Sequence, residues 1–185
     1  MIGTLDKDVI KVLTVFGVSP GSHLKRTLIQ EKTNINNIIL NKTLFKLVNL
    51  TILKKEKNYY YLNFEEKSSK TLLALIQAHY TKLKHLPLRE YFIILDIYFE
   101  LLSFANISAV YLFGSYAKLI FTEKSDIDIA IITEESDKKA LKSSLHTLEK
   151  RHNKTIELHF FGKDFYKNKR DPLVKDVVTH GVQLI

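Results

Sequence analysis

Acidic residues stand inside two stretches of the sequence that are otherwise apolar. Asp126 and Asp128 alternate with isoleucine in SDIDIAII, and Glu157 interrupts the apolar run KTIELHFF. Alternate residues of a strand point to the same face, so Asp126 and Asp128 are expected side by side. Carboxylates beside an apolar core are costly unless a cation compensates them. The pattern therefore predicts a divalent metal, most naturally Mg²⁺, which uses one or two protein carboxylates and takes further ligands from water and substrate phosphates.

Glu157 and His159 share a face of the second stretch, because they are two residues apart. If the two stretches form adjacent strands, Glu157 could complete a two-metal cluster or accept the proton of an attacking hydroxyl. His159 could touch the site, but we expect it to be a histidine at the solvent edge.

Gly114 and Ser115 lie between a predicted strand, residues 108–113, and a short predicted helix, residues 116–119. Glycine allows close approach of a phosphate, serine offers a hydroxyl, and a helix start offers free N–H groups. A Gly-Ser pair alone is a common turn, but here ten residues separate Ser115 from Asp126. A purely structural alternative exists, in which Asp126 caps a turn, Asp128 lies at a solvated sheet edge and Glu157 pairs with a lysine.

The stretch GSYAKLIFTEKSDIDIAI resembles the GS-x10-D-x-D signature of the DNA polymerase β-like nucleotidyltransferases in their minimal form. The resemblance covers roughly residues 105–185, where VKDVVTHGVQLI is similar to the closing helix and strand of these domains. It implies that Gly114 and Ser115 bind a triphosphate. It also implies that Asp126 and Asp128 bind Mg²⁺, with Glu157 as the third carboxylate.

Three positions show how the chain compares with that family. Lys118 stands where these small proteins often have a basic residue near the phosphates. Leu119 stands where a glycine often follows, and Glu157 stands where aspartate is commoner. The resemblance implies transfer of a nucleoside monophosphate, by default AMP from ATP, to a hydroxyl. Minimal members are often antitoxins that add AMP to a tyrosine of a partner HEPN-domain ribonuclease, so a HEPN-type toxin is the implied partner.

The elements that must position these residues alternate between strands and helices. We predict strands over residues 108–113, 126–132 and 155–161 and helices over residues 136–151 and 173–180. The fold class is therefore α/β (α+β), a nucleotidyltransferase sheet with flanking helices. Two amphipathic helices, residues 68–86 and 88–104, are expected to connect this domain, residues 105–185, to the N-terminal part.

The N-terminal part, residues 1–67, is predicted to hold three short helices, over residues 5–16, 23–31 and from about 34 to 48. A hairpin formed by residues 50–55 and 59–64 follows. This order predicts a winged helix-turn-helix domain. Five lysines would meet DNA phosphates there: Lys42 and Lys46 on the third helix, and Lys54, Lys55 and Lys57 on or beside the wing. The same elements also occur in docking modules, in which the lysines are only solvated.

Composition sets limits on these hypotheses. The 185 residues carry a net charge of +8 and no cysteine, so disulfides and thiolate metal sites are excluded. We expect no membrane span, because no run of about 18 apolar residues occurs. We also expect a cytoplasmic location. Two functions remain open: a Mg²⁺-dependent nucleotidyltransferase of antitoxin type, or a DNA-binding regulator with a vestigial transferase domain.

Overall fold

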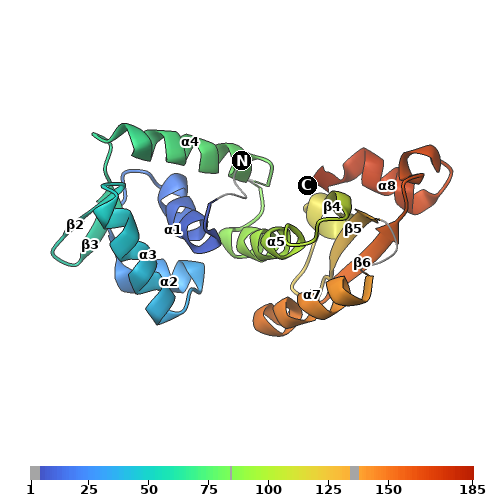
Figure 1. The fold of residues 1–185 in the computed structure, drawn as a ribbon, viewed down its shortest axis with the longest axis horizontal. Coiled ribbons are helices and arrows are strands. Elements are labelled where there is room, and N and C mark those ends of the chain that lie inside the picture. Colours follow the sequence, from blue (N-terminus) through green and yellow to red (C-terminus); the bar gives the residue numbers. More distant parts are fainter. Residues whose placement is uncertain (1–4, 84, 134–137) are drawn as a thin grey trace. The chain divides into compact units, whose positions relative to one another are not determined.

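The computed structural model describes residues 5–83, 85–133 and 138–185. The chain divides into two compact units, residues 1–92 and 93–185, and the boundary falls inside helix α5. Figure 1 shows the order of the elements along the chain. Among the described residues, no helix is both long and apolar enough to cross a membrane.

The first unit begins with three helices. They are α1 (Lys7–Val18), α2 (Arg26–Thr33) and α3 (Asn37–Asn49), and a two-residue strand, β1 (Leu24–Lys25), precedes α2. Helix α2 starts later than the predicted residue 23, and Lys25 at its N-cap makes no side-chain capping bond. Helix α3 also starts later than predicted, after Asn36, whose side chain accepts the N–H of Ile38.

The hairpin of the first unit consists of β2 (Leu53–Glu56) and β3 (Tyr59–Leu62), with β1 on the other side of β3. The register pairs Lys55 with Tyr60, and Lys57 in the turn has a φ of 51°. Helix α4 (Lys67–Thr81) packs against α1 and supplies Ile76 to a shared core.

The buried face of α3 uses only some of its apolar residues. Leu40, Leu44 and Leu47 are buried at helical spacing, whereas Ile38 and Ile39 are 65% and 44% exposed. The sequence does not distinguish these isoleucines from the buried leucines, because an apolar run gives no sign of which side of the helix meets the core.

The second unit contains the rest of α5 (Leu88–Leu101) and a mixed sheet. Its described strands are β4 (Ile107–Phe113), β5 (Ile127–Thr133), β6 (Ile156–Phe161) and β7 (Val182–Gln183), in the order β6-β5-β4-β7. Strand β5 is antiparallel to β4 and parallel to β6. The helices are α6 (Gly114–Ala117), α7 (Lys138–His152), the 3-10 helix η3 (Phe165–Lys167) and α8 (Pro172–His180). The predicted start of α7 at Ser136 lies outside the described residues.

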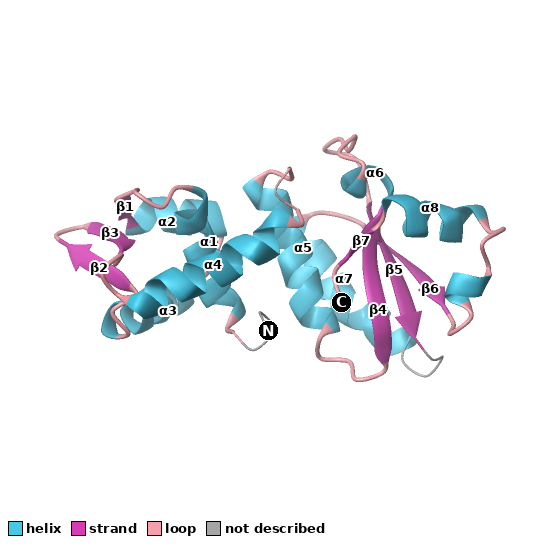
Figure 2. Cartoon of the chain, turned by 90° about the horizontal axis from the view of Figure 1, so that it is seen from above, coloured by secondary structure: helices cyan, strands magenta, loops and turns pink. Residues whose placement is uncertain are grey.

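The two faces of this sheet are covered by different helices, as Figures 1 and 2 show. On one face, Val174 and Val177 of α8 pack in a small core with Phe113, Ala130 and other residues of β4 and β5. Helix α7 lies against the opposite face beside β6 and buries Leu141, Leu145 and Leu148. The mixed α/β fold with flanking helices agrees with the predicted class. We call the face that α8 covers the acid face, because register places Asp128 and Glu157 on it.

Candidate active site at the acid face

The turn after β4 is shaped around the carboxylate of Asp128. Gly114 has a φ of +67°, and a Cβ atom placed on it would lie 2.0 Å from Oδ2 of Asp128. A side chain at position 114 would therefore be strained by its backbone conformation and would also collide with the acid. From the sequence, we explained Gly114 by the close approach of a phosphate. Its contact with Asp128 is a second reason for a glycine at this position.

Asp128 and Glu157 lie at the same level of two adjacent parallel strands. They are direct register partners across β5 and β6, and Phe113 is the partner of Asp128 on β4. Strand β5 is an inner strand, which contradicts the structural alternative that placed Asp128 at a sheet edge. Burial raises the pKa of Asp128, and the negative charge of Glu157 raises it further. The site thus disfavours the ionised form unless a cation is bound.

Asp126 lies just before β5 and its side chain is exposed. Its charge also raises the pKa of Asp128, by less than burial and Glu157 do. Among the described residues, however, the ligand atoms that lie within 4.8 Å of one another belong to Asp128, Glu157 and His159. The structure brings together two of the three predicted acids, and a metal-binding role for Asp126 stays a prediction.

His159 belongs to this cluster, so of the two roles that the sequence left open, contact with the site is the one that the structure shows. Its Nε2 lies 3.4 Å from Oε1 of Glu157, and its ring meets the ring of Phe113 edge-on at 5.2 Å between centroids. The imidazole opposes the rise in the pKa of Asp128. The signal in the sequence was the two-residue spacing from Glu157, which fixes the face but not the distance.

Lys118 contacts a carboxylate that the sequence did not single out. Its Nζ lies 2.6 Å from Oδ1 of Asp176 on α8, and Nδ1 of His180 lies 2.9 Å from the same oxygen. The Lys118 side chain, followed by that of His180, lowers the pKa of Asp176. The predicted phosphate-binding role of Lys118 stays a prediction, and it requires the ammonium group to exchange Asp176 for a phosphate.

Leu119 follows with a φ of 59°, in the left-handed region that favours glycine. This conformation gives a physical reason for the glycine that the sequence comparison expected here. Leu119 is 46% exposed, so little packing compensates for the backbone strain.

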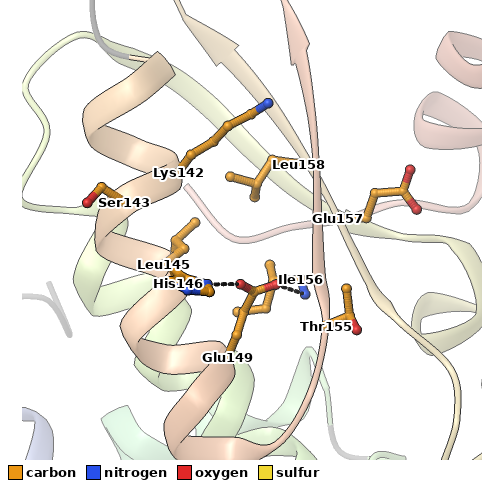
Figure 3. A pocket seen from close by; sticks show the side chains of 9 residues that line it. All are labelled: Lys142, Ser143, Leu145, His146, Glu149, Thr155, Ile156, Glu157 and Leu158. Carbon is orange, nitrogen blue, oxygen red and sulfur yellow. Dashed lines mark hydrogen bonds and ion pairs between the residues drawn. The ribbon is translucent and has the colours of Figure 1, made fainter.

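A surface cleft of about 670 Å³ lies between α7 and β6. Glu149 crosses it, accepting the N–H of Ile156 at 2.8 Å and contacting Nδ1 of His146 at 2.9 Å. In Figure 3 the carboxylate of Glu157 points away from these groups. Glu157 is one of the residues that line the cleft, but its carboxylate is directed elsewhere, and Glu149 acts in the cleft as a structural acceptor.

The five lysines predicted to bind DNA lie in the first unit. Lys42 and Lys46 are exposed on α3, and Lys55 and Lys57 are exposed on the hairpin. Lys54 differs from them because its Nζ lies 2.5 Å from Oε2 of Glu65, an ion pair on the surface. Lys55 also lies over the ring of Tyr60, 5.5 Å from its centroid.

Comparison with known proteins finds a family that the second unit resembles. Residues 98–185 match the family model described as "Polymerase beta, Nucleotidyltransferase", which is just under half of the chain. The segment holds the sheet and the acid face, so this part of the chain is similar to the nucleotidyltransferase domains of the polymerase β type. The comparison with curated proteins found no match.

Three solved structures that resemble the chain come from toxin–antitoxin systems. A mutant of the toxin–antitoxin MntA–HpeT is 25% identical, with a TM-score of 0.40, and the alignment covers 49% of this chain and 70% of that one. A toxin–antitoxin with AMP-PNP is 26% identical, with coverages of 50% and 70% and a TM-score of 0.38. A second MntA–HpeT mutant is 28% identical, with coverages of 49% and 69% and a TM-score of 0.38.

Proposed function

We propose that the protein transfers a nucleoside monophosphate, AMP from ATP, to a hydroxyl group. In this reaction the acceptor oxygen forms a bond to the α-phosphorus, the bond from that phosphorus to the bridging oxygen breaks, and pyrophosphate leaves. The observation that carries the proposal is the convergence of Asp128 and Glu157, from two strands, beside a turn that only glycine can make. The family match of residues 98–185 supports the reaction class.

The donor set fits a divalent cation. Two carboxylates at one register level, one of them half-buried with a raised pKa, repel each other unless a positive charge lies near them. Asp126, Asp128 and Glu157 would hold Mg²⁺, as hard oxygen ligands suit it. When bound, the metal supplies charge neutralisation for the triphosphate and the leaving pyrophosphate.

The remaining roles belong to the chain's own side chains. Glu157 is 57% exposed at its side chain, so an acceptor hydroxyl can reach it and pass its proton to the carboxylate. Gly114 and Ser115 would hold the triphosphate at the turn, with the Ser115 hydroxyl donating to a phosphate oxygen. Lys118 would join them after leaving Asp176, which keeps His180 as a partner.

The acceptor we propose is a tyrosine of a partner HEPN-type toxin, which makes the protein antitoxin-like. This part of the proposal depends on the resemblance of the GS-x10-D-x-D stretch to minimal nucleotidyltransferases. A tyrosine hydroxyl is a chemically suitable acceptor, because an adjacent carboxylate can take up its proton.

Incubation with ATP labelled at the α-phosphate tests the proposal. The protein, Mg²⁺ and a lysate of the source organism are combined, and label is followed in protein, RNA and small molecules. We expect label on one protein band, absent with the Asp126→Ala/Asp128→Ala variant and retained with Asp164→Ala. Asp164 is a suitable control because it is an exposed acid whose ion pair with Lys167 lies on the surface. Label on RNA would refute the toxin acceptor, and no transfer with any of the four NTPs would refute the enzyme.

A second candidate function is DNA binding by the first unit, as a winged helix. The supporting observation is the placement of exposed Lys42 and Lys46 on α3 and of Lys55 and Lys57 on the β2–β3 hairpin. These are the elements that meet phosphates in a winged helix-turn-helix. Retention of DNA upstream of the gene, measured at increasing salt, tests it. Retention that does not respond to salt or to Lys42→Ala/Lys46→Ala would contradict it.

A further inference from the structure

The acid face carries a nitrogen donor whose position the two-strand register fixes. His159 follows Glu157 by two residues on β6, and its register partner on β5 is Ala130. The alanine methyl is the small neighbour of the imidazole on this face, and Phe113 meets the ring edge-on. His159 is 24% exposed at its side chain, so the ring is held by neighbours on the sheet rather than extended into solvent.

The distances within the cluster suit an ion better than a direct hydrogen bond. The separation of 3.4 Å between His159 Nε2 and Glu157 Oε1 is longer than a good hydrogen bond. Two ligands about 2.1 Å from one ion are about 3 Å apart when adjacent and about 4.2 Å apart when opposite. The ligand atoms of Asp128, Glu157 and His159 all lie within 4.8 Å of one another, so small side-chain movements bring them to one ion.

We propose that His159 joins Asp128 and Glu157 as a ligand of the divalent metal, and that it shifts the preference of this site from Mg²⁺ toward Mn²⁺. The inference rests on the proposed function only in that the same carboxylates bind the metal. Mg²⁺ prefers oxygen ligands, whereas an imidazole nitrogen is a good ligand for transition metals. A site with two carboxylates and one imidazole therefore favours a transition-metal ion more than a site of carboxylates alone.

Binding of Mn²⁺ to the full chain, without nucleotide, tests this inference independently of transfer activity. Electron paramagnetic resonance follows the free Mn²⁺, competition gives the Mg²⁺ affinity, and spin-echo modulation reports a directly bound ¹⁴N nucleus. We expect ¹⁴N modulation from the wild-type protein. We expect His159→Gln to lose it, to bind Mn²⁺ at least about ten-fold more weakly and to change Mg²⁺ binding by less than about three-fold.

His146→Gln is the matched control, because His146 contacts Glu149 in the α7–β6 cleft rather than the acid face. It should keep the nitrogen signal and both affinities, and thermal unfolding confirms that each variant is folded. Mn²⁺ that binds through oxygen alone would overturn the role of His159 while leaving the proposed transferase intact. Equal weakening of Mn²⁺ and Mg²⁺ by His159→Gln would also overturn it, since that result describes a histidine that only orients Glu157. Absence of Mn²⁺ binding together with absence of transfer would refute both proposals.

Discussion

At the scale of single residues, the site depends on positions where the backbone leaves room for a carboxylate. Gly114 is the clearest case, because its missing side chain is the space that Asp128 occupies. The chemistry assigned to Asp128 is therefore also a constraint on the turn before it. Three substitutions test this scale.

Gly114→Ala should abolish transfer and lower the free energy of unfolding by at least about 2 kcal/mol. The left-handed conformation costs about 1–2 kcal/mol for a side chain, and the collision with Asp128 adds to it. Urea unfolding and labelled-ATP transfer measure the two effects. Gly162→Ala serves as the control, since a Cβ there meets nothing within 4 Å. Wild-type activity in Gly114→Ala would show that the acid and the turn are not coupled.

Leu119→Gly should raise the free energy of unfolding by about 0.5–1 kcal/mol. It relieves the cost of a φ of 59°, and the greater entropy of glycine in the unfolded chain offsets part of the gain. Leu119→Ala keeps the strain and should remain within about 0.5 kcal/mol of the wild type. Equal stability of all three proteins would indicate that the turn tolerates leucine without strain.

Asp128→Asn should stabilise the metal-free protein at neutral pH. The pKa of Asp128 is raised in the folded state, so folding opposes its ionisation. The resulting loss of folding free energy is absent below the ordinary pKa of an aspartate. It grows as pH rises toward the folded pKa of Asp128 and stays at its full size above that pKa. The difference in melting temperature between variant and wild type should therefore vanish in acid, and Mg²⁺ should stabilise the wild type alone. A wild type that is more stable than Asp128→Asn at neutral pH without metal would contradict the raised pKa.

At the scale of elements, helix α8 packs against the acid face. Its first turn is fixed by Asp171, whose Oδ1 accepts the N–H groups of Leu173 and Val174, and by Pro172 at the first helical position. The helix contributes Val174 and Val177 to the small core under the site, and Asp176 to the contact with Lys118.

Asp171→Ala should lower the free energy of unfolding by about 1 kcal/mol through the loss of this N-cap. Asp171→Ser keeps an acceptor and should recover most of the loss. Chemical denaturation of the three proteins measures the series. An alanine variant as stable as the serine variant would show that the capping bonds contribute nothing.

The sequence predicted the strands and long helices of the second unit well, because each has a clear period and Gly114 separates β4 from α6. It did not predict β1, whose two residues are too few to show a period, or the 3-10 helix η3. Of the candidate site, register placed Asp128 and Glu157 together as expected. The contacts of His159 and Asp176 could be found only from the distances in the structure. A shared strand face or a position on a helix does not show which side chain a residue contacts.

At the scale of the whole molecule, the chain carries two candidate functions on two compact units. The lysines of α3 lie in residues 1–92 and the acids in residues 93–185, so the functions should be separable by substitution. The net charge of +8 favours anionic partners in general and does not choose between a nucleotide and DNA.

Crossed variants test this separation. Asp128→Asn should abolish transfer and leave salt-dependent DNA retention unchanged. Lys42→Ala/Lys46→Ala should leave transfer unchanged and reduce the slope of log affinity against log salt by about 2, since each phosphate contact contributes about 0.9. Loss of both functions in either fully folded variant would show that the two units act together.

Strand β6 lies at the edge of the sheet. At the start of this strand, the Glu149 carboxylate accepts a hydrogen bond from the N–H of Ile156. An uncovered edge is a place where a second molecule can add its own strand, which begins aggregation. The hydrogen bond from Ile156 is the main reason that the pKa of Glu149 is lowered. The negative charge of Glu149 at the strand edge is therefore present at neutral pH and is lost as pH falls through the folded pKa. Storage in acid should therefore neutralise the Glu149 carboxylate at the β6 edge and favour aggregation, whereas buffers near neutral pH keep the charge.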